Sequence, residues 1–301
     1  MENKTVVGWD ASSRSEGALR WAVEREAPRQ GTLALVFVVE EANRGALGVD
    51  EAERQEAEAH AALRDATARL RQAAPECAVT TTVVRGRVVE SLLEFVNDDW
   101  VLAVGAHGDD TARRRFSLSV GARVAAAARG LVAVIPDRME SRGTGVVVGI
   151  DGSPEADAAI AFAADEAERV GEPLVLVHAW SEPVLMEGQP ILDNQFVEAL
   201  VGESKLLLAG ARERALQRRP EAQVSTRSVH GEPSTALVEL ATGAYELVLG
   251  SRGLRGIRRV LLGSVSRDTV VRSNCPTVIV GRAPEPLLAT LRPAGNRTLA
   301  R

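Results

Sequence analysis

The chain has 301 residues, 45% of them apolar, and carries 36 Lys and Arg against 41 Asp and Glu, for a net charge of −5. This composition is typical of a folded protein, and at roughly 100 to 200 residues per domain the length predicts two domains. Two cysteines, and four histidines without HExxH spacing, exclude a disulfide scaffold and a structural zinc site. Mild acidity and few aromatic residues disfavour a nucleic-acid partner. No apolar run approaches the ~20 residues of a membrane span, so we expect a cytoplasmic protein.

The sequence repeats itself once. At an offset of 141 residues, Gly8-Trp9-Asp10-Ala11-Ser12 falls on Gly149-Ile150-Asp151-Gly152-Ser153. At an offset of 145, Gly105, Gly108 and Ser119-Val120 fall on Gly250, Gly253 and Ser264-Val265. A period of this length is that of a domain rather than of a solenoid repeat. The sequence therefore predicts one domain over 1–138, a second over 144–283, and a loosely held tail over 284–301.

Each copy alternates between short apolar runs and segments with helical spacing. The first copy predicts strands at 5–8, 33–39, 79–84, 101–104 and 131–135, with helices after Ser12 and at 51–72, 88–97 and 120–128. The second predicts strands at 145–150, 174–179, 224–229, 247–249 and 277–280, with helices after Ser153 and at 195–218, 234–242 and 265–273. This α/β alternation predicts two tandem doubly wound parallel sheets of five strands each, Rossmann-like, with helices on both faces. Ligands of such sheets bind at the carboxyl ends of the strands.

A glycine-rich segment follows the fourth strand of the second copy. Gly250-Ser251-Arg252-Gly253 is separated by nine residues from Gly263-Ser264, and the segment between Gly250 and Ser264 holds four arginines and no acid. Glycines let backbone N–H groups approach a ligand, and the following helix N-terminus attracts anions. The segment is a candidate cradle for a phosphate chain. Asp151, at the end of the first strand, could accept a hydrogen bond from an adenine amino group or a ribose hydroxyl.

These residues resemble the universal stress proteins, specifically their tandem form with an ATP-binding GxxG-x9-GS motif. The resemblance spans roughly residues 3–283 and includes Cys275-Pro276 before the last strand. It implies adenine near Asp151, Ala179 and Val229, with phosphates on the glycine-rich segment. The candidate binding residues of the second copy are Asp151, Ser153, Ala179, Val229, Gly250, Arg252, Gly253, Gly263, Ser264 and Val265.

The first copy departs from this motif. Its candidate binding residues are Asp10, Gly105, Gly108, Ser119 and Val120. Leu118 stands where the third glycine of the motif belongs, and Asp109 and Asp110 reduce the charge of the loop from Gly105 to Ser119 to +1. Both changes weaken phosphate binding, so the sequence leaves open whether this site holds ATP and predicts that the second site binds it more tightly.

Several candidates have simpler interpretations. Gly250 and Gly253 could only turn the chain, Asp10 and Asp151 could only cap helices, and the arginines could form a solvated face. For His178 and His230 we favour a hydrogen-bond network over ligand contact. Cys275 and Cys77 are expected to pack as small apolar residues rather than to act as a thiol switch.

Nothing in the sequence supports catalysis. The only lysines are Lys4 and Lys205, neither in a glycine-rich loop, which excludes a Walker A site. No catalytic residue and no metal ligand is assigned. The resemblance implies an ATP-binding regulator in stress or dormancy, with or without Mg²⁺. The alternatives are a slow ATPase or nucleotidyl hydrolase on the same fold, and a scaffold without nucleotide.

The last strand of each copy, 131–135 and 277–280, is apolar and forms an exposed edge unless it is paired. We therefore expect, as the resemblance also implies, that the two strands pair within one chain as a pseudo-twofold dimer. A further homodimer is left open, and the sequence names no regulated protein partner and no membrane partner.

Overall fold

The computed structural model describes residues 4–40, 49–106, 119–137, 143–181, 194–252 and 262–281. Gly108, Leu118, Gly253 and the tail expected at 284–301 lie outside these residues. So do the loop arginines other than Arg252. The predictions that rest on them therefore stay predictions.

The elements follow the expected chain order in both copies. The first copy comprises β1 (Lys4–Gly8), α1 (Ser13–Glu26), a 3-10 turn (Ala27–Arg29), β2 (Thr32–Glu40), α2 (Val49–Ala73), β3 (Ala78–Gly86), α3 (Val88–Leu93), β4 (Val101–Gly105), α4 (Val120–Ala127) and β5 (Leu131–Ile135). The second comprises β6 (Val146–Gly149), α5 (Pro154–Val170), β7 (Leu174–Trp180), α6 (Asn194–Arg218), β8 (Val224–His230), α7 (Pro233–Leu240), β9 (Glu246–Gly250), α8 (Ser264–Arg272) and β10 (Thr277–Val280).

One boundary differs clearly from the expectation. The helix predicted over 88–97 ends at Leu93. The reason lies in Asn97, whose side-chain oxygen accepts hydrogen bonds from the backbone N–H groups of Asp99 at 2.8 Å and Trp100 at 3.1 Å. Asn side chains that bond to nearby backbone groups favour turns over helix. The chain thus turns early into β4.

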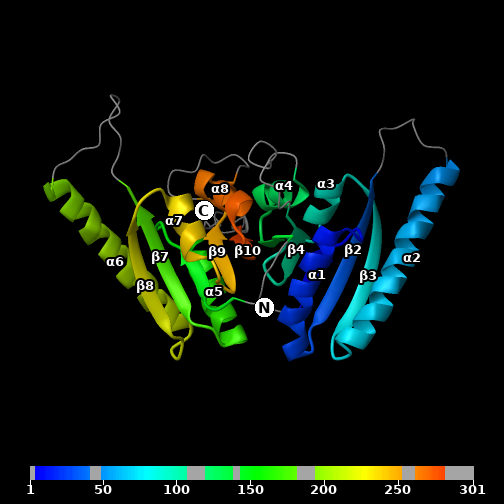
Figure 1. Ribbon diagram of the computed structural model, residues 1–301, viewed down its shortest axis with the longest axis horizontal. Helices are drawn as coiled ribbons and strands as arrows, with labels where there is room; N and C mark the ends of the chain where they lie inside the picture. The colour runs from blue at the N-terminus through cyan, green and yellow to red at the C-terminus, as the bar shows by residue number, and fades with distance from the viewer. Residues whose placement is uncertain are drawn as a thin grey trace, which may run out of the picture.

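The ten strands form one continuous sheet in the order β3-β2-β1-β4-β5-β10-β9-β6-β7-β8. Within each copy all pairs are parallel, as expected for a doubly wound fold. The copies meet at β5 and β10, which pair antiparallel with Leu131 opposite Val280 and Val134 opposite Thr277. Figure 1 shows this joint at the centre of the molecule. The expected pairing of the two final strands is therefore present.

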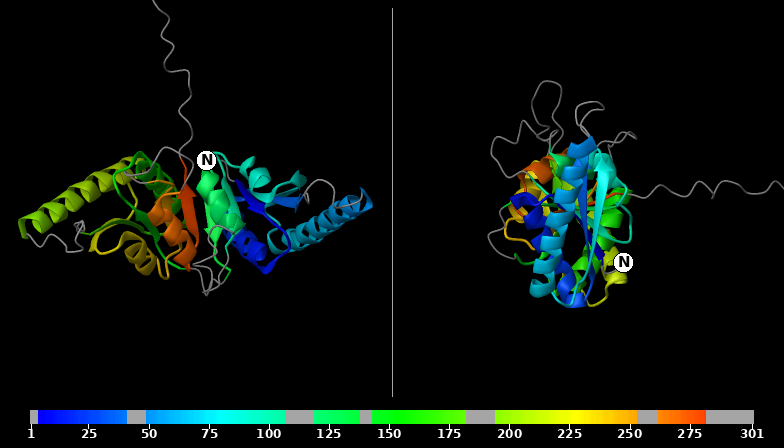
Figure 2. Two further views of the ribbon diagram at one scale, coloured as in Figure 1. Left: turned by 90° about the horizontal axis from the view of Figure 1, so that it is seen from above. Right: turned by 90° about the vertical axis from the view of Figure 1, so that its right-hand side faces the viewer.

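Helices cover both faces of the sheet, and neighbouring strand residues face opposite layers. Val7, Leu33 and Leu35 pack with residues of α1 and α2, whereas Val6 and Leu102 pack with residues of α3 and α4. The same division holds for the second copy. Figure 2 places α2 and α6 at the far ends of the molecule in its left-hand view.

Two kinds of feature are missing from the described part of the chain. It contains no helix that is long and apolar enough to cross a membrane. Nor does it bring three or more His, Cys, Asp or Glu side chains together as a metal site.

Candidate functional site

The candidate site of the second copy lies where β6 and β9, neighbours in the sheet, end at the same edge. From β6 the chain passes through α5 to one side of the sheet, and from β9 through α8 to the other. Such a switch point opens a crevice at the carboxyl ends of the strands. The crevice is a cavity of about 470 Å³. Its described lining residues are Gly149, Ile150, Asp151, Ala156, Val177, His178, Ala179, Pro233, Leu237, Leu249, Gly250, Arg252, Gly263, Ser264, Val265 and Ser266.

A tight turn between β6 and α5 fixes Asp151 at the cavity wall. The backbone N–H and the hydroxyl of Ser153 donate to Asp151 Oδ1 at 3.0 and 2.6 Å. The Ser153 hydroxyl also accepts from the Ala156 N–H at 3.1 Å and so caps α5. Ser153 is buried and is absent from the described lining. It therefore positions Asp151 and the helix.

The carboxyl end of β9 passes very close to the start of α5. A Cβ atom on Gly250 would lie 2.9 Å from the Cβ of Glu155, closer than side-chain carbons approach one another. The Ser266 hydroxyl donates to the Gly250 carbonyl at 2.7 Å, and the Gly263 N–H donates to the Ser251 carbonyl at 2.9 Å. Gly250 is thus required by packing as well as by its place in the motif.

The N-terminus of α8 faces this cavity. Gly263 takes the N-cap position and Ser264 is the first helical residue, so the N-cap residue has no side chain to cap the helix. Gly263, Ser264, Val265 and Ser266 all line the cavity. The first N–H groups of a helix have no partner within the helix, and here no cap residue supplies one. Together with the helix dipole they make a favourable position for an anion.

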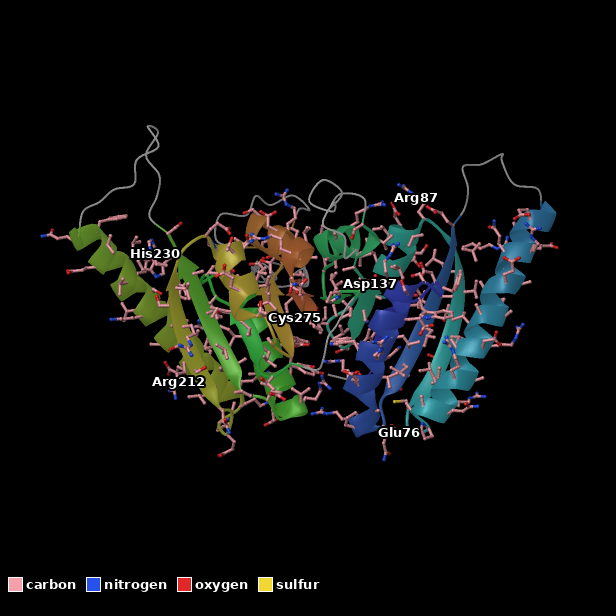
Figure 3. The ribbon with its side chains drawn as sticks, viewed as in Figure 1. Glu76, Arg87, Asp137, Arg212, His230 and Cys275 are labelled. Carbon is pink, nitrogen blue, oxygen red and sulfur yellow. The ribbon has the colours of Figure 1, made fainter. Side chains whose placement is uncertain are left out.

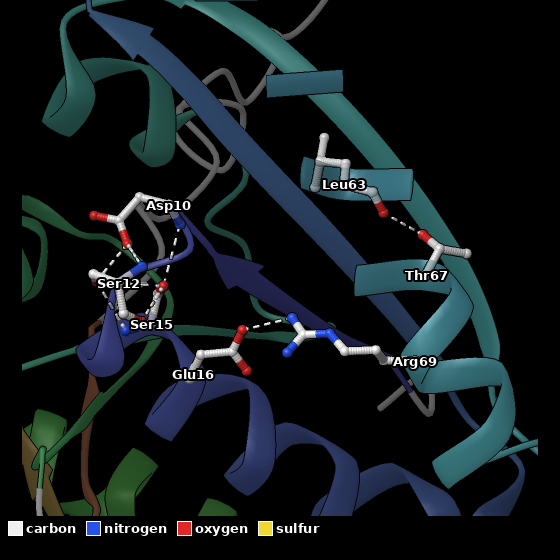
Figure 4. A network of polar contacts seen from close by, with 7 residues as sticks. All are labelled: Asp10, Ser12, Ser15, Glu16, Leu63, Thr67 and Arg69. Carbon is white, nitrogen blue, oxygen red and sulfur yellow. Dashed lines mark hydrogen bonds and ion pairs between the residues drawn. The ribbon is translucent and has the colours of Figure 1, made fainter. Parts of the chain in front are cut away.

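The first copy has an equivalent but smaller cavity, of about 330 Å³. Its described lining residues are Gly8, Trp9, Asp10, Ser12, Arg14, Ser15, Val36, Val38, Glu40, Val88, Leu92, Val104, Gly105 and Val120. The Ser12 N–H and hydroxyl donate to Asp10 Oδ1 at 3.0 and 2.5 Å (Figure 4). Burial raises the pKa of Asp10, but hydrogen bonds from Ser12 and Ser15 outweigh it, and the net effect is a pKa below the usual value.

Two features of the first site make it less suited to an anion. Ser119 is the N-cap of α4, and its hydroxyl accepts from the Ala122 N–H at 3.2 Å, where the second copy has uncapped Gly263. The acidic Glu40 also lines the cavity. One backbone N–H group at the N-terminus of α4 is thus already hydrogen-bonded within the protein. Glu40 also adds a negative charge to the site.

The tandem arrangement and the motif positions point to one family, and comparison with known proteins decides it. The sequence model of the universal stress protein family matches residues 1–136 and again residues 144–281. The chain belongs to the universal stress protein family. Two such proteins of Mycobacterium tuberculosis are similar over nearly their whole length. One is 30% identical over 296 residues, covering 92% of this chain and 97% of the relative. The other is 32% identical over 303 residues, covering 93% of this chain and 95% of the relative.

A solved structure has the same fold across both copies. The crystal structure of a universal stress protein from Archaeoglobus fulgidus matches with a TM-score of 0.69 at 20% identity, covering 93% of this chain and 97% of that chain. The predicted family and fold class are therefore confirmed.

In this universal stress protein, sequence reasoning missed most of the cavity wall. Ile150, Val177, Leu237 and Leu249 make it apolar. They carry no chemical signature that separates them from core residues, since each continues the apolar pattern of its strand or helix. Val229, expected near adenine, is not among the described lining residues, whereas Ala179 is.

His178 both lines the cavity and belongs to a hydrogen-bond network. Its Nδ1 lies 2.8 Å from the hydroxyl of buried Ser204, which lies 2.7 Å from the hydroxyl of Ser228. Burial lowers the pKa of His178, against the opposing charges of Asp151 and Glu203. His230, at the end of β8 (Figure 3), packs its ring 4.8 Å from that of Trp180. The network favoured from the sequence is present for His178.

Proposed function

We propose that the second copy binds ATP in its cavity and that the protein is a cytoplasmic, nucleotide-dependent regulator in stress or dormancy. The observation that carries the proposal is the uncapped N-terminus of α8, which opens into the same cavity as Asp151. An anion site and a hydrogen-bonding carboxylate in the lining of one pocket match the phosphate and adenosine parts of a nucleotide.

The remaining lining fits the adenosine part of such a ligand. Ile150, Val177 and Leu237 give an apolar wall for a flat base, and a volume of about 470 Å³ lies in the usual range of small-molecule pockets. Asp151 can accept from a ribose hydroxyl. Ser264, Val265 and Arg252 then face the phosphates, where Arg252 adds a charge-assisted donor.

We propose binding without turnover. Hydrolysis needs a group that orients or deprotonates water beside the terminal phosphate. Asp151 is the one carboxylate among the described lining residues, and it lies at the β6 end of the cavity, held by Ser153. Slow hydrolysis remains the rival, and phosphate release followed with and without Mg²⁺ distinguishes the two.

Calorimetric titration with ATP tests the site through a matched pair of variants. Gly263→Asp places a carboxylate at the N-cap of α8, where it both caps the helix and repels phosphate. Gly263 has φ −56° and ψ 150°, which a side chain adopts without strain. The corresponding N-cap change in the first copy is Ser119→Asp, which exchanges one N-cap residue for another.

We expect Gly263→Asp to weaken ATP binding at least tenfold and Ser119→Asp to change it little. Thermal unfolding without ligand should show both variants folded, since Asp is a good N-cap. Unchanged binding in Gly263→Asp would refute the site. Equal losses in the two variants would show that the sites are ranked wrongly.

A further inference from the structure

A buried ion pair joins the two copies beside the strand joint. Arg25, near the end of α1, donates through Nη1 to Glu166 Oε1 on α5. Arg25 is 5% exposed and Glu166 is fully buried. Arg169 adds a second bond between the copies, from its Nη1 to the Arg25 carbonyl at 2.7 Å, and its Nε donates to Glu166 Oε2 at 2.8 Å. Figure 1 shows α1 and α5 side by side on either side of the joint.

Arg25 and Glu166 occupy the same position in the two copies. They are separated by 141 residues, which is the offset of the repeat. In a twofold arrangement, equivalent positions contact each other only where they lie at the axis. Arg25 and Glu166 therefore lie at the pseudo-twofold axis. Any two halves that pair through this joint bring the residues at this position into contact.

The strand joint does not by itself distinguish one partner from another. β5 and β10 are equivalent strands, both fully buried and almost wholly apolar, and they pair antiparallel. Two first halves or two second halves could form the same joint. Such pairs would place Arg25 against a second Arg25, or Glu166 against a second Glu166. Like charges brought together without water repel strongly.

We propose that the Arg25–Glu166 pair selects the partner at this joint. Each half accepts the complementary half of the chain and rejects a second copy of itself. The interface is thus specific for a partner of the same fold that carries the opposite charge at the axis. A homodimer that pairs two first halves or two second halves at this joint is therefore disfavoured.

Charge reversals in the full chain reproduce the like-with-like contacts. Arg25→Glu sets two carboxylates together at the axis, as two second halves would, and Glu166→Arg sets two guanidinium groups together, as two first halves would. Arg25→Met, Glu166→Met and their combination remove the charges but keep apolar bulk. The combined reversal, Arg25→Glu with Glu166→Arg, leaves each new residue beside a like charge of its own half, Glu26 in the first and Arg169 in the second, but restores opposite charges at the axis. The readout is the urea midpoint of unfolding.

We expect each single reversal to unfold at a lower midpoint than the Met variant at its position. The double Met variant should be less stable than the wild type, because buried Arg169 loses Glu166, but more stable than either single reversal. The combined reversal should lose less stability than the sum of the losses of the two single reversals. A single reversal that fails to fold while the double Met variant folds counts as the expected result. The proposal is overturned if the single reversals match the Met variants, or if the loss in the combined reversal equals or exceeds the sum of the two single losses.

Discussion

In each copy, the turn before the helix that follows the first strand contains a residue with positive φ at the same point. Only in the second copy is this residue a glycine. Gly152 has φ +79°, and its counterpart Ala11 has φ +62°. A left-handed conformation costs a residue with a Cβ roughly 1–2 kcal/mol, partly offset by the lower entropy of its unfolded chain. The first copy is therefore strained at its own site.

We predict that Ala11→Gly raises the free energy of unfolding by about 0.5 kcal/mol and that Gly152→Ala lowers it by about 1 kcal/mol. The second change is the matched reverse of the first, with a further close contact because the new Cβ lies 3.1 Å from Leu207 Cδ1. Urea denaturation of both variants measures the effect. Destabilisation by Ala11→Gly would contradict the strain.

Glu246, buried at the start of β9, makes stability depend on pH. Burial raises its pKa from 4.5 to about 7, against the opposing charges of Arg25 and Arg169, while Tyr245 and Cys275 are the other titratable groups coupled to it. Because the folded-state pKa is the higher one, the folded state holds the proton more tightly. Stability due to this group is thus greatest below pH 4.5 and falls as the pH rises to 7.

The variant Glu246→Gln isolates this effect, because it removes the titration and keeps the shape. We expect it to be more stable than the wild type at about pH 8, by up to about 3 kcal/mol, and to differ little at about pH 5. The free energy of unfolding of both proteins at the two pH values gives the comparison. A difference that does not change with pH would show that Glu246 does not titrate in this range.

At the scale of elements, two equivalent serines have different tasks. Ser119 is the N-cap of α4, whereas Ser264 lies one position inside α8 and faces the cavity. We predict that Ser119→Ala lowers the free energy of unfolding by about 1 kcal/mol with little effect on ATP binding. Ser264→Ala should weaken ATP binding with little effect on unfolding. The reverse pattern would contradict the assigned roles.

The sequence predicted the elements well because each copy alternates cleanly and repeats the other. It also singled out Asp151, Gly250 and Ser264, which the fold brings to one cavity, because their spacing follows a motif. It could not predict the apolar wall, because Leu237 and Leu249 look like core residues. Nor could it predict the interface charges. The repeat aligns Arg25 with Glu166, but only the fold shows that the two meet.

At the scale of the whole molecule, the pairing of β5 with β10 joins the sheets of the two copies into one ten-stranded sheet. Ala133 is fully buried in β5, opposite Val278. We predict that Ala133→Asp, which buries an unpaired charge there, splits the unfolding of the chain into two transitions. The wild type should unfold in one. Urea denaturation followed by circular dichroism distinguishes the two cases, and a single transition in the variant would contradict coupling through the joint.

Nucleotide binding in the second copy is the central claim, and the nucleotide content of the freshly purified protein tests it most directly. The protein is denatured, and the released small molecules are identified and counted against the chain. We predict about one adenine nucleotide per chain, as ATP, from the wild type and from Ser119→Asp, and almost none from Gly263→Asp. A wild-type protein that releases no nucleotide and takes up none when ATP is added would contradict the claim.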